Sequence, residues 1–167
     1  MKHQILALAL TLTSATAFAA PQSYSLPALK ELCAMDAGNE DEFAFEKAFA
    51  DVSEFDIKEV QSISDKDLAM VNAHLVDHEY TANALTFAEL KALFGPGGDQ
   101  AYNDLYVITF KSKTTGRVYT HVKTYPGDNP YGLIFDNKTL KPVAHNGDGS
   151  IVLLTNNGSY SCWELDK

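Results

Sequence analysis

The stretch from Leu105 to Trp163 reads LYVITFKSKTTGRVYTHVKTYPGDNPYGLIFDNKTLKPVAHNGDGSIVLLTNNGSYSCW. Apolar and polar residues alternate in several short runs of it, and turn residues separate these runs. Such alternation is typical of strands that bury one face. Asn156-Asn157-Gly158, between two of the runs, is a strong hairpin signal. The stretch therefore predicts an antiparallel sheet of about five strands.

The chain before this stretch favours helices. Helical spacing or helix-start signals occur in four segments, which begin at Pro27, Glu40, Ser64 and Thr86. Glu54 to Ile63 alternates weakly and is ambiguous between strand and helix. The glycine-rich break at 95–98 separates the helical part from the strands. We therefore expect an α+β fold, in which three to four N-terminal helices pack on the C-terminal sheet.

The first residues have the pattern of a secretory signal. Lys2 supplies a positive start, Ile5 to Leu12 is a short apolar run, and Ala17-Phe18-Ala19 has the small residues that a signal peptidase recognises. The apolar run is too short to remain as a membrane anchor. We expect residues 1–19 to be a signal peptide and 20–167 to be a single periplasmic or secreted domain, without membrane insertion after cleavage.

The charge of the chain is strongly negative and unevenly spread. The sequence has 13 basic and 22 acidic residues, and loss of Lys2 with the signal would leave 12 − 22 = −10. Glu31 to Asp67 has three lysines and 12 acidic residues, whereas Leu105 to Lys141 has a net charge of +4. Such a chain is a poor general binder of nucleic acid or anionic membrane, because like charges repel. It suits a basic protein partner or, more simply, solubility.

Cys33 and Cys162 are the only cysteines. Two cysteines in an exported protein most simply form one disulfide. The sequence therefore predicts a bond that ties the first helix to the end of the sheet. A catalytic thiol is the alternative, but neither cysteine lies in a nucleophile or metal motif.

The histidines raise the question of a metal site. His74 and His78 are four residues apart, a spacing that zinc sites use on a helix, but Leu75 stands where a hydrolytic motif has glutamate. His145 and Asp148 belong to a turn that has only part of a calcium-loop pattern. We keep these four residues as metal candidates beside a simpler interpretation, which is surface histidines and a hairpin turn. The sequence predicts no cofactor.

The most distinctive motif is the loop Tyr125-Pro126-Gly127-Asp128-Asn129-Pro130-Tyr131-Gly132. Tyrosine and asparagine are effective recognition residues, and loops on a rigid sheet often carry function. The motif predicts a binding site made of Tyr125, Asp128, Asn129 and Tyr131. The simpler interpretation is a structural loop whose tyrosines pack on the sheet.

No pattern of nucleophile and base is present, so catalysis is not the favoured interpretation. We expect an exported binding protein, of the inhibitor or immunity type, that neutralises a cationic enzyme by occlusion. One alternative is a small exported hydrolase or metal-dependent enzyme that uses His74, His78, His121 or His145. The other is a non-catalytic ligand-binding module of the cell envelope.

Overall fold

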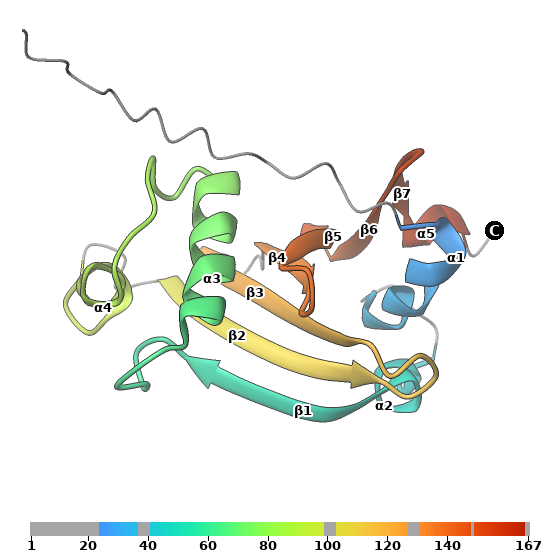
Figure 1. Ribbon diagram of the computed structural model, residues 1–167, viewed down its shortest axis with the longest axis horizontal. Coiled ribbons are helices and arrows are strands. Elements are labelled where there is room, and N and C mark those ends of the chain that lie inside the picture. Colours follow the sequence, from blue (N-terminus) through green and yellow to red (C-terminus); the bar gives the residue numbers. More distant parts are fainter. Residues whose placement is uncertain (1–23, 37–40, 99–102, 127–130, 148, 166–167) are drawn as a thin grey trace, which may run out of the picture.

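The computed structural model describes residues 24–36, 41–98, 103–126, 131–147 and 149–165, so the predicted signal peptide lies outside the described residues. Within them the chain forms one antiparallel sheet whose seven strands lie in sequence order (Figure 1). The strands are β1 Phe49–Asp56, β2 Asn103–Ser112, β3 Val118–Pro126, β4 Tyr131–Asp136, β5 Lys141–Gly147, β6 Ser150–Thr155 and β7 Gly158–Ser161.

Helices cover both faces of this sheet. They are α1 Leu26–Leu29, η1 Lys30–Met35, α2 Ala44–Ala48, α3 Asp65–Asp77, α4 Phe87–Phe94 and α5 Cys162–Leu165. In Figure 1, α3 and α4 lie at one end of the molecule, and the other helices lie at the opposite end. Val107 and Leu133 contact the α3–α4 cluster, whereas their neighbours Ile108 and Ile134 belong to a cluster with α1 and η1. Since successive strand residues point to opposite faces, the two groups of helices cover opposite faces.

The face under α3 and α4 is here called the α3 face. Ser64 caps α3 by accepting a hydrogen bond from the Asp67 amide (3.0 Å), and Thr86 caps α4 in a reciprocal capping box with Glu89. Both caps were predicted from the sequence and are confirmed. The helices bury an apolar cluster against the sheet: Ile57, Met70, Val71, Leu75, Leu90, Phe94, Leu105, Val107, Val122, Leu133 and Phe135.

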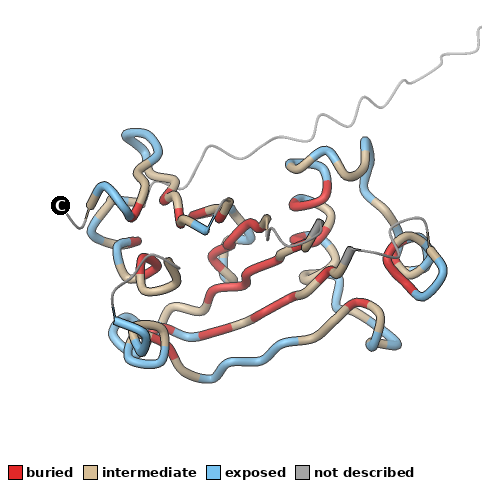
Figure 2. Tube along the Cα trace, turned by 180° about the vertical axis from the view of Figure 1, so that it is seen from behind, coloured by how far each residue is buried: buried red, intermediate tan, exposed pale blue. Residues whose placement is uncertain are grey.

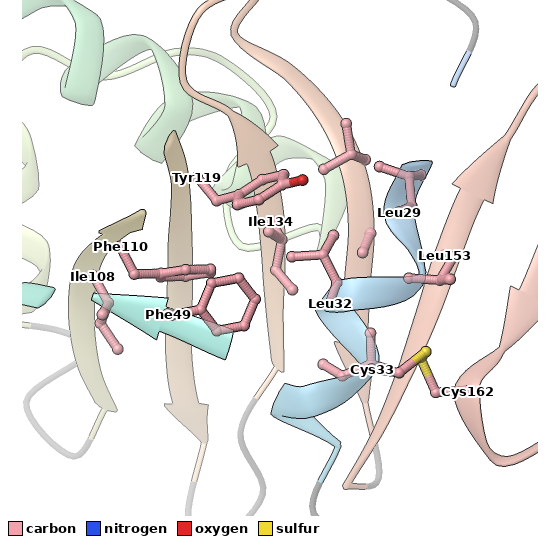
Figure 3. Close-up of a cluster of buried hydrophobic side chains, with 13 residues drawn as sticks. Leu29, Leu32, Cys33, Phe49, Ile108, Phe110, Tyr119, Ile134, Leu153 and Cys162 are labelled. Carbon is pink, nitrogen blue, oxygen red and sulfur yellow. A yellow bond between two sulfur atoms is a disulfide. The ribbon is translucent and has the colours of Figure 1, made fainter. Parts of the chain in front are cut away.

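The opposite face is here called the disulfide face. Cys33 of η1 and Cys162 of α5 form the predicted disulfide, which is confirmed. Figure 3 shows this bond and the Leu29 and Leu32 side chains in one cluster, with the aromatic rings of Phe49 and Phe110 on the side away from the bond. These side chains pack the N-terminal helices onto the sheet.

A half-buried carboxylate, that of Glu31, reinforces this packing. The Tyr119 hydroxyl donates to Glu31 Oε1 (2.7 Å), and the Ser112 hydroxyl donates to Glu31 Oε2 (2.5 Å). Burial and the nearby Glu31 carboxylate raise the pKa of Tyr119. The hydroxyl therefore keeps its proton and remains the donor to η1.

The predicted arrangement, three to four N-terminal helices on a C-terminal sheet of about five strands, is wrong. Seven strands form, and the first of them lies in the part of the chain that was expected to be helical. The helix predicted from Glu40 to Val52 is reduced to α2 within the described residues. From Phe49 onward the backbone pairs with β2, which satisfies its hydrogen bonds and buries Phe49 at the same time. Tertiary pairing thus overrides the helical spacing of the aromatic residues.

None of the helices within the described residues is both long enough and apolar enough to cross a membrane.

Candidate functional site

The tyrosines of the predicted recognition loop point to different faces of the sheet. Tyr125 ends β3 on the disulfide face, where its ring lies 5.8 Å from that of Tyr106 and 5.0 Å from Lys123 Nζ. Tyr131 begins β4 on the α3 face, and its ring centroid lies 6.1 Å from that of His78. The structure therefore does not bring the two tyrosines together. Asp128 and Asn129, which were predicted to act with them, lie outside the described residues.

A histidine cluster occupies the α3 face at the C-terminal end of α3. His74 and His78 lie one turn apart on the helix, and their ring centroids are 4.5 Å apart. His145 of β5 is close enough for His78 to lower its pKa, although burial is the larger cause of that lowering. The structure thus brings together three of the four metal candidates. The fourth, Asp148, lies outside the described residues.

His74 is the buried centre of the cluster. Its side chain is fully buried, and its Nε2 lies 3.2 Å from the Thr124 hydroxyl oxygen. The Thr124 hydroxyl itself donates to the Tyr80 hydroxyl (2.9 Å), so it is an acceptor for His74. We therefore assign the proton of His74 to Nε2, which leaves a bare lone pair on Nδ1.

The lone pair on His74 Nδ1 is unusual because it is buried and has no hydrogen-bond partner among the described residues. Burial is the main cause that lowers the pKa of His74 to about 2, and the neighbouring His78 and His121 contribute to the lowering. The ring is therefore neutral at any physiological pH. A neutral ring in this position holds α3 against β3 without placing a charge in the apolar cluster.

The histidine cluster does not have the geometry of a metal centre. Among the described residues, no group of three or more His, Cys, Asp or Glu side chains is arranged to hold a metal ion. His78 is also engaged elsewhere, because its Nδ1 lies 3.2 Å from the His74 carbonyl oxygen and 3.4 Å from Asp77 Oδ2. The described arrangement is a packed set of imidazoles at a helix–sheet contact.

His121 lies on the disulfide face, apart from the other histidines. Its Nε2 donates to Asn146 Oδ1 (2.7 Å) across Gly132, whose missing side chain leaves the space for this contact. Burial is the main cause that lowers the pKa of His121 to about 4. Spacing in the sequence gives no indication of this pairing. His121 is on β3 and Asn146 is on β5, and β4 lies between these two strands.

A second candidate site is the acidic surface that follows α2 and β1. We call it the acidic edge and define it by its exposed acidic residues: Asp41, Glu42, Glu46, Asp51, Glu54 and Glu59. β1 is an outer strand of the sheet, and Figure 2 shows its trace largely exposed where β2 and β3 are buried. The sequence predicted an acidic layer of helices here. The structure places most of these charges on a strand and on the segments beside it.

The lysines of the same segment do not neutralise this surface. Lys47 pairs with Asp41 (2.6 Å), whereas Lys58 pairs with Asp104 of β2 and Lys66 donates to the Asn137 side chain. Two of the three lysines are therefore directed to other parts of the fold. Lys111 of β2 lies 3.8 Å from Asp51 Oδ2, so among the described residues four of the six carboxylates of the acidic edge have no lysine partner.

A β-bulge shapes the middle of the acidic edge. The register of β1 against β2 shifts between Ala50 and Ser53, and Asp51 has a positive φ of 53°. Asp51 and Val52 are both exposed there, and Val52 keeps 52% of its accessible surface. A bulge of this kind interrupts the regular row of backbone groups that an added strand would need. The edge therefore presents side chains rather than a template for strand addition.

No protein-family model, no curated protein and no solved structure matches this chain. The function must therefore be argued from the residues themselves.

Proposed function

We propose that this protein is a non-catalytic binding protein whose acidic edge covers a basic surface on another protein. The observation that carries the proposal is the gathering of exposed carboxylates on α2 and β1, beside two exposed apolar side chains. A cationic enzyme is the partner class that fits best. The protein would then act as an inhibitor or immunity-type protein that blocks the enzyme by occlusion.

Exposed apolar side chains accompany the carboxylates of the acidic edge. Phe43 and Val52 keep 57% and 52% of their accessible surface, and both belong to the segment of the acidic edge. Protein interfaces commonly combine apolar or aromatic anchors with a polar rim. The same combination would let charge guide the partner while the apolar contacts slow its dissociation.

The proposal places the protein in the periplasm or outside the cell. The signal pattern of residues 1–19 supports export, and the Cys33–Cys162 disulfide is consistent with an oxidising compartment. In that location the partner would be a basic exported or imported protein.

Charge reversal on the acidic edge tests the proposal. The oxidised protein is immobilised and exposed to envelope extract at low salt and at about 1 M salt, where the Debye length falls to about 3 Å. We expect a basic protein to be retained at low salt and released at high salt. The variant Glu46→Lys/Glu54→Lys should no longer retain this basic protein at low salt.

A matched variant controls for net charge. Glu79→Lys/Glu164→Lys makes the same change in net charge at exposed positions outside the acidic edge, so it should retain the partner. The protein captured is then purified and its own activity is measured with and without this chain. Equal loss of partner binding in both variants, or a partner that is not basic, would contradict the proposal. If the captured enzyme keeps its full activity in the presence of this chain, the inhibitory role is excluded.

A further inference from the structure

The helices of the α3 face are an insertion between two neighbouring strands. β1 and β2 pair directly with each other, yet the chain between them includes both α3 and α4. Figure 1 shows these two helices at one end of the molecule, away from α1, η1 and α5. The strand ladder does not depend on them for its hydrogen bonds. Their departure would therefore break none of the strand pairings.

The contact of α3 with the sheet combines apolar packing and two polar links. Met70, Val71 and Leu75 are buried against the α3 face. At the start of the helix Lys66 donates to the side chain of Asn137, which follows β4. The buried polar link runs from His74 Nε2 to the Thr124 hydroxyl and on to the Tyr80 hydroxyl, at 3.2 Å and 2.9 Å. This link requires only the Nε2 proton of His74.

Among the described residues, no group next to His74 Nδ1 could accept a hydrogen bond from a second proton on the ring. On its own helix His74 faces the His78 ring, and Asp77 lies beyond His78 with its side chain 60% exposed. The other titratable neighbours of His74 are Tyr80 after α3, Tyr131 on β4 and His145 on β5, whereas His121 and Lys123 of β3 lie on the other face of the sheet. The carboxylate among these neighbours, Asp77, therefore lies at the protein surface. A protonated His74 would be a buried cation among imidazoles.

The disulfide face is held together differently. Cys33–Cys162 ties η1 to α5 covalently, and Glu31 accepts hydrogen bonds from Ser112 and Tyr119. His121, the histidine of that face, already has Asn146 as its partner. A change that acts on His74 would therefore act on one face only.

We propose that α3 and α4 form an acid-released flap over one face of the sheet, and that His74 is the group whose protonation releases it. When the flap is closed, His74 Nδ1 is buried and cannot accept a proton without losing its place in the apolar cluster. When the flap is open, water solvates the ring and the proton is accepted. Acid therefore favours the open form, in which Val107, Val122 and Leu133 lose their cover.

The pH window follows from the two protonation states of His74. The closed form binds no proton on His74 until the pH nears 2, whereas a solvated imidazole binds one near its ordinary value of 6.5. Between these two pH values the open form binds one proton more than the closed form. Its population then rises about tenfold for each pH unit of acidification below about 6.5.

Hydrogen–deuterium exchange measured by mass spectrometry tests the flap. The oxidised protein is compared at about pH 7 and about pH 4.5, with correction for the intrinsic pH dependence of amide exchange. We expect residues 65–77 and 87–94 to lose at least about tenfold in protection at the lower pH. Residues 30–35 and 150–155, on the disulfide face, should lose clearly less, because their protection falls only with the global stability that His121 lowers in acid.

Variants separate the proton from the packing. His74→Phe keeps an aromatic ring but cannot bind a proton, so the pH dependence of protection in α3 and α4 should vanish. His74→Gln serves the same purpose if the phenylalanine variant does not fold. Tyr80→Phe removes the link to Thr124 without removing a histidine, so protection should fall at both pH values and keep its pH dependence.

Two results would overturn the flap. One is an unchanged pH dependence in His74→Phe or His74→Gln. The other is an equal loss of protection on both faces of the sheet, which would mean global acid unfolding instead of release of one face.

Discussion

At Gly132, a hydrogen atom stands where any other residue would have a Cβ. A Cβ there would lie 2.3 Å from His121 Nε2, 2.6 Å from Asn146 Oδ1 and 2.8 Å from the Val122 carbonyl oxygen. The backbone oxygen cannot move far because it belongs to the ladder between β3 and β4. Gly132 therefore makes the hydrogen bond between His121 and Asn146 possible.

Substitution Gly132→Ala should destabilise the protein by about 1–3 kcal/mol, which is the range for overpacking a tight site. Urea unfolding followed by circular dichroism measures the change. Gly147→Ala is the matched control, because a Cβ at Gly147 would meet only the Tyr131 ring at an ordinary 3.6 Å. Equal effects of the two substitutions would contradict the role assigned to Gly132.

His121 should make stability depend on pH. Its folded-state pKa of about 4 lies below the ordinary 6.5, so between these values the unfolded chain binds a proton that the folded protein does not. Acid therefore favours unfolding, and the free energy of unfolding should rise by about 3 kcal/mol from pH 4 to pH 6.5 on account of this residue. Urea unfolding at a series of pH values measures the slope. His121→Gln should flatten it, and an unaltered slope in that variant would exclude His121 as its source.

Among the secondary-structure elements, the short helix α4 has a polar anchor to the segment that follows β1. Lys91 Nζ donates to the carbonyl oxygens of Ile57, Lys58 and Val60, at 3.3, 2.7 and 3.1 Å. An ammonium group has three hydrogens, and all three are used here. The lysine thus joins α4 to the backbone between β1 and α3.

Removal of this anchor should destabilise the protein. In Lys91→Met the three carbonyl groups lose a charged donor, and we expect a loss of about 1.5–3 kcal/mol in the free energy of unfolding. Lys138→Met changes an exposed lysine and should stay within about 0.5 kcal/mol of the parent protein. Thermal and urea unfolding of both variants give the comparison. An unchanged free energy of unfolding in Lys91→Met would mean that water replaces the ammonium group without loss of stability.

The elements that the sequence predicted correctly are those with local causes. Ser64 and Thr86 identify the starts of α3 and α4 because a capping hydrogen bond spans only three residues. β1 was missed because its cause lies about sixty residues away, in the β2 backbone that pairs with it. Phe45 and Phe49 have helical spacing, and both rings contact Phe110 of that distant strand. Local spacing cannot distinguish these two arrangements.

The same limit applies to the candidate sites. The spacing of His74 and His78 correctly placed both rings on one side of α3, because helical geometry fixes residues four apart. The approach of His145 required the order of the strands, which no local pattern contains. Tyr125 and Tyr131 were grouped because they flank one loop. Strand alternation and register send them to opposite faces.

At the scale of the whole molecule, each face of the sheet has its own kind of reinforcement. The disulfide face has a covalent bond and a hydrogen-bond network around the half-buried Glu31 carboxylate, and the α3 face has apolar packing around neutral histidines. The acidic edge runs along the outer strand between them. Binding at that edge and release of the α3 face therefore involve different residues and can be tested separately.

The bond between Cys33 and Cys162 also determines how the protein would respond to a pulling force. The bond joins residues 129 positions apart, close to the first and last described residues. A load applied at the two ends passes through the sulfur atoms and bypasses the strand ladders. About 430–460 Å of extensible chain is thereby shielded, at about 3.3–3.6 Å per residue.

Single-molecule stretching of the oxidised protein should accordingly show no lengthening of this size, and addition of a reductant should release it. Lengthening before reduction would mean that the bond does not carry the load. A protein with this linkage can be pulled from both ends by its surroundings while its sheet remains under no tension.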